Sequence, residues 1–238
     1  MKSRMLVMIA LVLSLAPWAQ AARFDDRDPW ENWNRKVFAF NDVLDQYALR
    51  PVAQAYRDVM PQVLDNCVTN FFNNLRRIPT LGNQILQLKP VPAAETTLSL
   101  IFDTLFGLGG VIDVAHEWGL RDQKEDFGQT LVHWGLPDGP YLVLPFLGPR
   151  TVSDAVGIVP DNLWTGVFDY TPHRDTRLVA KAVEVVDKRA DVIPAERMIQ
   201  GDRYLFIRNA YLEKRNYDIL DGVILNDPFA DDDPYFDE

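Results

Sequence analysis

The sequence predicts an all-α protein with a single domain. Over most of the chain the apolar residues recur at spacings of three and four, which is the pattern of amphipathic helices. A length of 238 residues suits one domain, and 47% hydrophobic beside 24% charged residues is ordinary globular composition. The glycine- and proline-rich segment 135–157 is the longest piece that we expect to be irregular, with a short strand or hairpin possible at 141–144.

The first 21 residues have the features of a secretory signal peptide. Lys2 and Arg4 precede an apolar run at 5–15, and Ala-Gln-Ala at 19–21 supplies a small-x-small end. The run is shorter than the ~20 residues that span a bilayer as a helix. We therefore expect cleavage after this segment and export of the mature chain, the alternative being an uncleaved amphipathic anchor.

The first helix is expected to begin just after Asp28, as its N-cap, with Pro29 in the first helical position. One apolar stripe then continues along it through Trp30, Trp33, Val37, Phe40, Leu44 and Tyr47. Arg50-Pro51 should end or kink this helix, because the residue before a proline disfavours the helical conformation.

Three further helices are expected in the middle of the chain. The second begins at Pro61 and closes at Ile78-Pro79, and the third continues to Lys89-Pro90. The fourth covers 92–106 and ends at a group of glycines. A short helix follows at 126–134, where the aspartate and a glutamine three residues later resemble a capping box.

Two clearer amphipathic helices, at 175–189 and 203–221, complete the predicted domain, which we place at residues 22–225. The last residues, 226–238, are strongly acidic, and we expect them to form a mobile tail.

The composition argues against several function classes. A net charge of −10 makes nucleic acid a poor partner, because phosphate binding needs clustered lysine and arginine. One cysteine, Cys67, rules out a disulfide within the chain and a thiolate zinc site, and three scattered histidines disfavour a histidine metal site. We expect no metal and no cofactor.

The sequence also offers little support for catalysis. It lacks the G-x-S-x-G elbow, the H-E-x-x-H zinc helix and the P-loop. Asp113 and His116 stand three apart and could orient a general base, but an ordinary helix hydrogen bond is the simpler interpretation. We expect a protein that is not an enzyme, with no catalytic residues. A lipid hydrolase that uses Asp113, His116 or His133 is the alternative.

Two nearly uncharged stretches, 96–112 and 140–149, are broken by glycine or proline and fall short of a full membrane span. They form either a well-buried core or a surface that meets lipid. For either stretch alone, a core position is the favoured interpretation.

Several motifs together resemble the MlaA (VacJ) family of outer-membrane lipid-asymmetry proteins of Gram-negative bacteria. They are DPWENWNRKVFAFNDVLDQYALRPVAQAY at 28–56, NFFNNL at 70–75, Asn83 with Leu86-Gln87, GLGGVIDVA at 107–115, EDFGQTL at 125–131, WG…GPYLVLPFLGP at 134–149, and Tyr204, Arg208, Ala210-Tyr211 and Arg215. The likeness covers roughly residues 28–222.

This resemblance implies a ring-like arrangement of amphipathic helices in the inner leaflet of the outer membrane, beside a trimeric porin. A polar-lined channel through the ring would admit phospholipids misplaced in the outer leaflet and pass them to a periplasmic lipid-binding shuttle protein. No covalent chemistry is implied. The alternative is a helical scaffold that docks on a porin without conducting lipid.

The resemblance also indicates candidate residues for the lipid channel. From the first helix these are Asn34, Arg35, Phe40 and Asn41, which mix polar and apolar side chains as a lipid path requires. Gly107, Gly109 and Gly110 would permit close packing or a bend at membrane depth. Hydrogen bonds between helices would use the same asparagines and arginine.

The chain departs from the family pattern at three places. It has no cysteine before Cys67 and hence no lipobox, so we expect attachment through the ring's own apolar surface or through a porin. Ser99-Leu100 and Ser153-Asp154 stand where the family often has Arg-Phe and Arg-Asp. The two missing arginines leave family salt bridges or headgroup contacts in doubt, but not the fold.

Overall fold

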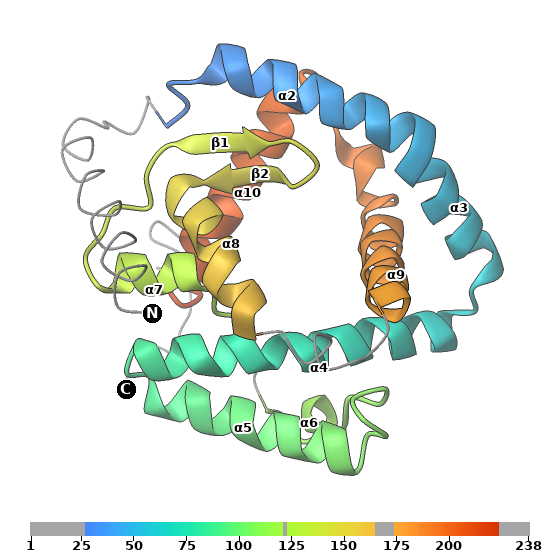
Figure 1. Ribbon diagram of the computed structural model, residues 1–238, viewed down its shortest axis with the longest axis vertical. Helices are drawn as coiled ribbons and strands as arrows, with labels where there is room; N and C mark the ends of the chain where they lie inside the picture. The colour runs from blue at the N-terminus through green and yellow to red at the C-terminus, as the bar shows by residue number, and fades with distance from the viewer. Residues whose placement is uncertain (1–26, 121–122, 165–173, 224–238) are drawn as a thin grey trace, which may run out of the picture.

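A computed structural model describes residues 27–120, 123–164 and 174–223. The predicted signal peptide, 1–21, and the predicted acidic tail, 226–238, lie outside the described residues. Within them the chain forms helices and one two-stranded antiparallel sheet, so the predicted fold class is confirmed. Figure 1 shows the elements following one another around a ring.

The upper and right-hand side of the ring is one curved helical arc (Figure 1). It consists of α2 (Glu31–Leu44), the π-helical turn η2 (Asp45–Leu49) and α3 (Arg50–Val59). The predicted break at 50–51 takes the form of this π turn, and the helix does not stop there. Pro51 is tolerated because it stands in the first turn of α3.

The start of the arc differs from the prediction. Trp30, not Asp28, occupies the N-cap position of α2. The Asp28 carboxylate instead accepts hydrogen bonds from the Asn34 amide at 2.7 Å and from the Tyr204 hydroxyl. Asn34 within α2 and Tyr204, which is distant in the chain, therefore occupy the carboxylate that would otherwise cap the helix.

The lower side of the ring is the helix α4 (Gln62–Leu86), with α5 (Pro90–Leu105) packed antiparallel beneath it (Figure 1). The predicted closure of a helix at Pro79 is wrong, because α4 continues through this buried proline. Its contacts with α5, α7, α8 and α9 hold the backbone helical, and tertiary packing thus overrides the local propensity. The prediction of a helix at 92–106 is confirmed by α5.

A short helix, α6 (Val114–Glu117), follows α5, and α7 (Phe127–His133) begins as predicted. The Asp126 carboxylate caps α7 by accepting the Gln129 backbone N–H at 2.8 Å, and the Gln129 side chain donates back to it at 3.1 Å. The predicted N-cap at Asp126 is confirmed, whereas the reciprocal bond of a capping box, from the N-cap backbone N–H to the Gln129 side chain, is not made.

The segment predicted to be irregular, 135–157, contains more order than expected. A hairpin of β1 (Tyr141–Leu144) and β2 (Gly148–Thr151) pairs Tyr141 with Thr151, and α8 (Val152–Trp164) starts directly after it. Gly157 lies inside α8, where a Cβ would come within 2.6 Å of the Gly128 nitrogen on α7. This glycine therefore permits close helix packing and does not mark a loop.

The chain ends with α9 (Arg174–Val192), the 3₁₀ turn η4 (Ala195–Met198) and α10 (Arg203–Ile219). Both long helices agree with the prediction. In Figure 1, α9 is seen nearly end-on at the right of the opening, and it packs on α3 and α4. α10 contacts α7 and β2 on the opposite side of the ring.

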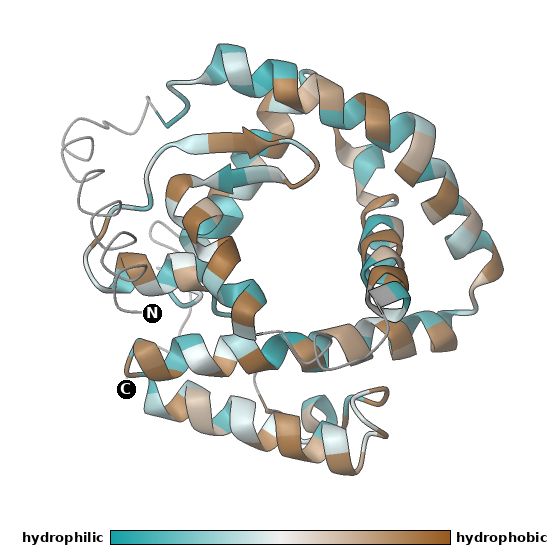
Figure 2. Ribbon diagram, in the orientation of Figure 1, coloured by the Kyte–Doolittle hydropathy of each residue, from teal (hydrophilic) through white to brown (hydrophobic). Residues whose placement is uncertain are grey.

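The described part of the molecule buries polar side chains and exposes apolar ones. On α5, Thr96, Ser99 and Asp103 are buried, whereas the large apolar residues Leu98, Ile101, Leu105, Phe106, Leu108 and Ile112 on and after this helix are exposed. The core position favoured for 96–112 is therefore wrong, because its polar face turns toward α4. In Figure 2 hydrophilic and hydrophobic segments alternate along the helices of the ring.

The second uncharged stretch, 140–149, is divided. Tyr141 and Val143 are fully buried against α2 and α10, whereas Phe146 and Leu147 at the hairpin tip are exposed. Among the described residues, no helix combines the length and the apolar character needed to cross a bilayer. The apolar surface is thus spread over several short helices.

Candidate functional site

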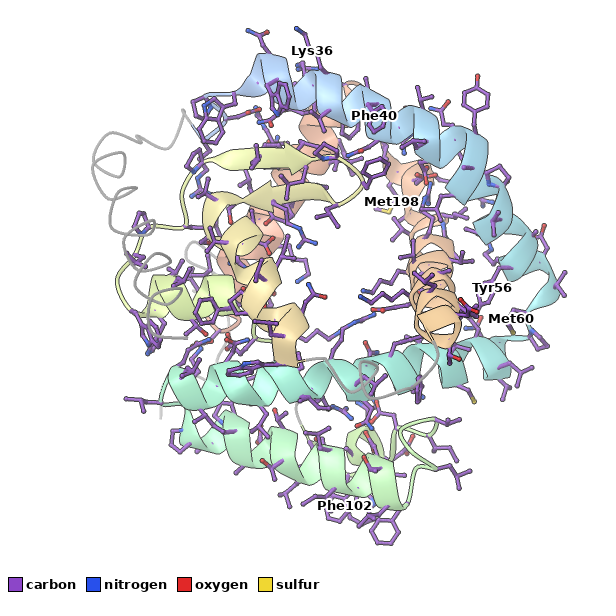
Figure 3. All side chains as sticks on the ribbon, viewed as in Figure 1. Lys36, Phe40, Tyr56, Met60, Phe102 and Met198 are labelled. Carbon is purple, nitrogen blue, oxygen red and sulfur yellow. The ribbon has the colours of Figure 1, made fainter. Side chains whose placement is uncertain are left out.

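A cavity of about 690 Å³ lies between α4, α7, β2, α8, α9 and α10. Its basic and acidic lining residues are equal in number and come from α4, the segment before α7, β2, α8, α9 and α10. The basic residues are Arg76, Lys124, Arg150, Lys181, Lys214 and Arg215. The acidic residues are Glu125, Asp126, Asp154, Asp161, Glu184 and Asp218. Figure 3 shows side chains reaching from the surrounding elements toward the middle of the ring.

An apolar strip accompanies these charges. Phe72, Leu75 and Pro79 from α4 line the cavity beside Leu178 from α9. A cavity with both kinds of surface suits an amphiphile, since a charged headgroup needs polar partners and an acyl chain does not.

Arg215 of α10 holds one end of the cavity together. Its guanidinium is almost fully buried and contacts Asp126 at 2.6 Å and Asp138 at 3.3 Å. Burial by itself would raise the pKa of the Asp126 carboxyl, but the Arg215 charge and hydrogen bonds from Arg215 and Gln129 outweigh it and hold that pKa below its ordinary value. Asp126 therefore stays ionised at neutral pH.

Asp154 of α8 is the next acid along the wall. It accepts hydrogen bonds from the Tyr211 hydroxyl at 2.5 Å and from Arg150 Nη1 at 3.1 Å. Burial and the Asp154 charge raise the pKa of Tyr211 far above its ordinary value, so the phenol remains a donor. Arg150, four residues earlier in the chain, thus supplies Asp154 with a guanidinium.

The wall between α4 and α9 is closed by Glu184. Arg76 donates to its carboxylate through Nη2 at 2.7 Å and Nε at 3.1 Å, and Lys188 approaches at 2.8 Å. Burial would raise the pKa of Glu184, but Lys188 and Arg76 together keep it below its ordinary value. This ion pair joins two helices that are distant in sequence.

Polar groups also connect α4 to its other neighbours. Arg77 and Asp103 form a buried ion pair between α4 and α5, and Asp103 also accepts the Ala115 N–H at 2.8 Å. Asn83 donates to Asp161 of α8 at 2.8 Å and accepts from the Thr130 hydroxyl of α7 at 2.9 Å. α4 therefore makes buried or half-buried polar contacts with α5, α7, α8 and α9.

Asn34 and Asn41, predicted as channel residues, bind the hairpin to α2. Asn34 is fully buried, donates to the Tyr141 carbonyl at 3.1 Å and accepts the Val143 N–H at 2.8 Å. Asn41 donates to the Leu144 carbonyl and accepts the Phe146 N–H, both at 2.9 Å. Neither lines the cavity.

Arg35 and Phe40 make comparable connections. Arg35 bonds Glu31 at 2.7 Å and Asp202 at 2.9 Å, with its guanidinium 4.4 Å from the centre of the Tyr204 ring. Phe40 meets Phe146 edge to face at 5.5 Å, and Figure 3 places it beside the arc. Both lie outside the cavity lining.

The three predicted glycines form the turn after α5. Gly110 has a φ of +95°, and a Cβ there would come within 2.5 Å of Asn74 on α4. Gly109 has a φ of +77° and open space around it, whereas a Cβ on Gly107 would meet the Ile112 carbonyl at 2.1 Å. This tight turn lets the chain return to α4 at Asn74.

The catalytic alternatives gain no support from the geometry. The His116 backbone N–H donates to Asp113 at 3.1 Å, which is an ordinary helix cap, and neither His116 nor His133 lines the cavity. In the ranges that the structure describes, no three histidine, cysteine or acidic side chains gather where they could hold a metal ion.

Sequence reasoning missed most of the cavity residues. A signal was present on α9, where Lys181, Glu184 and Lys188 follow one another at spacings of three and four on the face opposite the valines. Nothing local distinguishes such a face from a solvated one, because the cavity forms only when α9 meets α4 and α8.

Comparison with known proteins places these features in a family context. The model of the family described as MlaA lipoprotein matches residues 26–218. An uncharacterized protein of Rickettsia typhi is 36% identical over 186 residues, covering 77% of this chain and 74% of that one. The intermembrane phospholipid transport system lipoprotein MlaA of Escherichia coli K12 is 34% identical over 197 residues, covering 80% and 77%.

A solved structure agrees with the fold as well. It is described as the structural basis for maintenance of bacterial outer membrane lipid asymmetry, and it superposes with a TM-score of 0.70 at 33% identity. The match covers 81% of this chain and 98% of the other.

Proposed function

The chain belongs to the MlaA lipoprotein family, and from this membership we propose that it maintains outer-membrane lipid asymmetry by removing mislocalised phospholipids from the outer leaflet. The lipid passes through the central cavity and is handed to a periplasmic lipid-binding shuttle protein, which is retrograde intermembrane phospholipid transport. No covalent bond is made or broken, and the protein acts without a cofactor.

One observation carries this proposal. The ring surrounds a cavity of about 690 Å³ with charged and apolar walls, while large apolar side chains outside the lining of this cavity are exposed on α2, α3 and α5. Water-soluble proteins normally show the opposite distribution, with apolar side chains inside and charged ones outside. This inverted polarity supports a protein seated in lipid that offers a polar path through itself.

The same surface supports a position in the periplasmic leaflet of the outer membrane. α5 has 16 residues and is therefore about 24 Å long, shorter than a span, so its exposed Leu98, Ile101 and Leu105 suit one leaflet. A trimeric porin is the proposed neighbour in the membrane. Its flank would cover part of the outward apolar surface.

The proposal is tested by outer-leaflet phospholipid in a deletion strain of the source bacterium, measured with a membrane-impermeant amine reagent. Surface phospholipid should rise on deletion and return to its wild-type level when the gene is restored. No rise, in a strain without a second copy, would count against transport.

A pair of variants on α9 makes the test specific to the cavity. Leu178→Trp places an indole inside the lining, whereas Val192→Trp adds the same bulk at an exposed position outside it. We expect Val192→Trp to restore asymmetry and Leu178→Trp to fail. The alternative of a non-conducting scaffold docked on a porin requires both variants to work, and it requires the purified protein to retain no phospholipid.

A further inference from the structure

Within the described residues, the acids of the cavity are matched by donors. Glu184 has Arg76 and Lys188, Asp154 has Arg150 and Tyr211, and Asp126 has Arg215. The remaining acids are bonded as well: Glu125 with Lys89, Asp161 with Asn83, and Asp218 with Lys214. An additional anion in the cavity must therefore be bound by a cation that these acids do not use, or by donors that a paired cation leaves unoccupied.

Arg150 on β2 is the first such cation. Only its Nη1 donates, to the two Asp154 oxygens at 3.2 and 3.1 Å. Its Nη2 makes no hydrogen bond within residues 27–120, 123–164 and 174–223, and its Nε is buried without an acceptor. A guanidinium presents five donors in a plane, and the two N–H groups of Nη2 are the ones left for a ligand, because Nη1 bonds Asp154 and Nε is buried.

Lys181 on α9 is the second. Its exposed side chain lines the cavity and forms no ion pair or hydrogen bond with any residue that the structure describes. It stands three residues after Leu178, which lines the same cavity, so the ammonium and an apolar side chain share one face of α9.

Neighbouring charges strengthen the positive character between these two walls. Burial lowers the pKa of the Lys188 ammonium, and the charges of Arg76 and Arg150 lower it further against the opposing effect of Glu184. The charge of Arg150 on β2 therefore acts on the Lys188 ammonium of α9. Arg76 and Lys188 bond Glu184, Arg150 bonds Asp154, and Lys181 lines the same cavity without a bonded acid among the described residues.

We infer that Arg150 and Lys181 form a phosphate-binding subsite inside the cavity. Arg150 donates to the phosphate through Nη2, and Lys181 supplies a point charge from α9. Leu178 and Leu75 lie in the same lining, where they contact the first carbons of an acyl chain. The phosphate is thus that of a lipid headgroup, and in this respect the inference rests on the proposed function.

The test measures binding of fluorescent phosphatidic acid and of diacylglycerol with the same acyl chains to the purified full chain in mild detergent. Wild-type protein should prefer phosphatidic acid. Arg150→Gln/Lys181→Gln should weaken phosphatidic acid binding about 100-fold and leave diacylglycerol unchanged, since a charge-assisted contact of about 1.4 kcal/mol corresponds to tenfold in affinity.

Two further variants control for folding and for net charge. Lys181→Gln alone removes an exposed side chain that holds nothing in place, and it should cost about tenfold. Lys36→Gln/Arg57→Gln removes two charges from exposed positions outside the lining, and Figure 3 places Lys36 on the outer side of the arc. This control should keep the wild-type preference.

The outcomes separate the subsite from the proposed function. If both cavity variants keep the preference for phosphatidic acid, the subsite is refuted while lipid transport stands. If no lipid binds but glycerol 3-phosphate binds through Arg150 and Lys181, the anion site stands for a free solute and the transport proposal fails. If neither kind of probe binds wild-type protein, both are wrong.

Discussion

Replacing Asn34 with alanine should destabilise the protein by releasing the β-hairpin from α2. This fully buried amide accepts the Val143 N–H at 2.8 Å and donates to the Tyr141 carbonyl at 3.1 Å and to Asp28 at 2.7 Å. Alanine leaves the two hairpin groups buried without partners. Each orphaned group costs about 1–3 kcal/mol, so we expect a loss of roughly 2–6 kcal/mol in the free energy of unfolding.

The assay is urea unfolding of the purified protein in a fixed detergent, followed by tryptophan fluorescence. Asn41→Ala is the matched control, because Asn41 makes the same two kinds of bond to the hairpin but is only half-buried, and water can replace it. It should cost about 1 kcal/mol or less. Asn34→Asp keeps the acceptor for Val143 and sets a second carboxylate beside Asp28, so part of its stability should return when acid protonates it.

Equal stability of Asn34→Ala and wild type would refute this reasoning. If that stable variant also failed to restore lipid asymmetry, Asn34 would contact lipid directly, as the family resemblance suggests. A large loss of stability, with transport recovered at low temperature, would instead make Asn34 a positioning residue for the hairpin.

Three more predictions follow from buried charge and from the outward apolar surface. Arg77→Met should cost roughly 3–5 kcal/mol of unfolding free energy by leaving Asp103 buried and unpaired, and adding Asp103→Leu should recover most of it in urea titrations. Burial raises the pKa of the Asp187 carboxyl, so the folded state favours the protonated group. This contribution to the free energy of unfolding is fully present below about pH 4 and is lost as the pH rises through the raised pKa. The melting temperature of Asp187→Asn should therefore increase relative to that of wild type between about pH 4 and about pH 8. A difference in melting temperature that stays constant over this range would contradict the prediction. Each half-exposed apolar side chain of α5 should contribute about 1 kcal/mol to membrane binding. Replacing three of them with serine should therefore weaken vesicle binding by roughly 3 kcal/mol, or about two orders of magnitude, in a flotation assay. The positions are Leu98, Ile101 and Leu105.

The helices that the sequence predicts well are those whose signals are local. α9 and α10 combine a regular apolar stripe with a polar face, and the cap of α7 depends on Asp126 and Gln129 three residues apart. The error at Pro79 has the opposite origin, because long-range packing decides whether a buried proline breaks a helix.

The location of the apolar surface was also beyond local reasoning. In water an uncharged stretch such as 96–112 belongs in a core, and the sequence alone does not tell which solvent the protein meets. Its buried members Thr96, Ser99 and Asp103 are spaced three and four apart, so the polar stripe was visible. Its meaning depends on Arg77, which lies 26 residues from Asp103 in the chain.

The π turn at Asp45–Leu49 sets how the arc meets the rest of the molecule. A π turn holds one residue more than the α-helical turn it replaces, and each residue rotates a helix by about 100°. Deleting one residue here would turn the π turn into an ordinary α-helical turn and leave α3 in register, so that Tyr56 could still reach Asp187 on α9, now at 3.0 Å, whereas a deletion within α3 would rotate Tyr56 away. Length variation by one residue is therefore tolerated in this segment, because the packing of α3 on α9 does not depend on it.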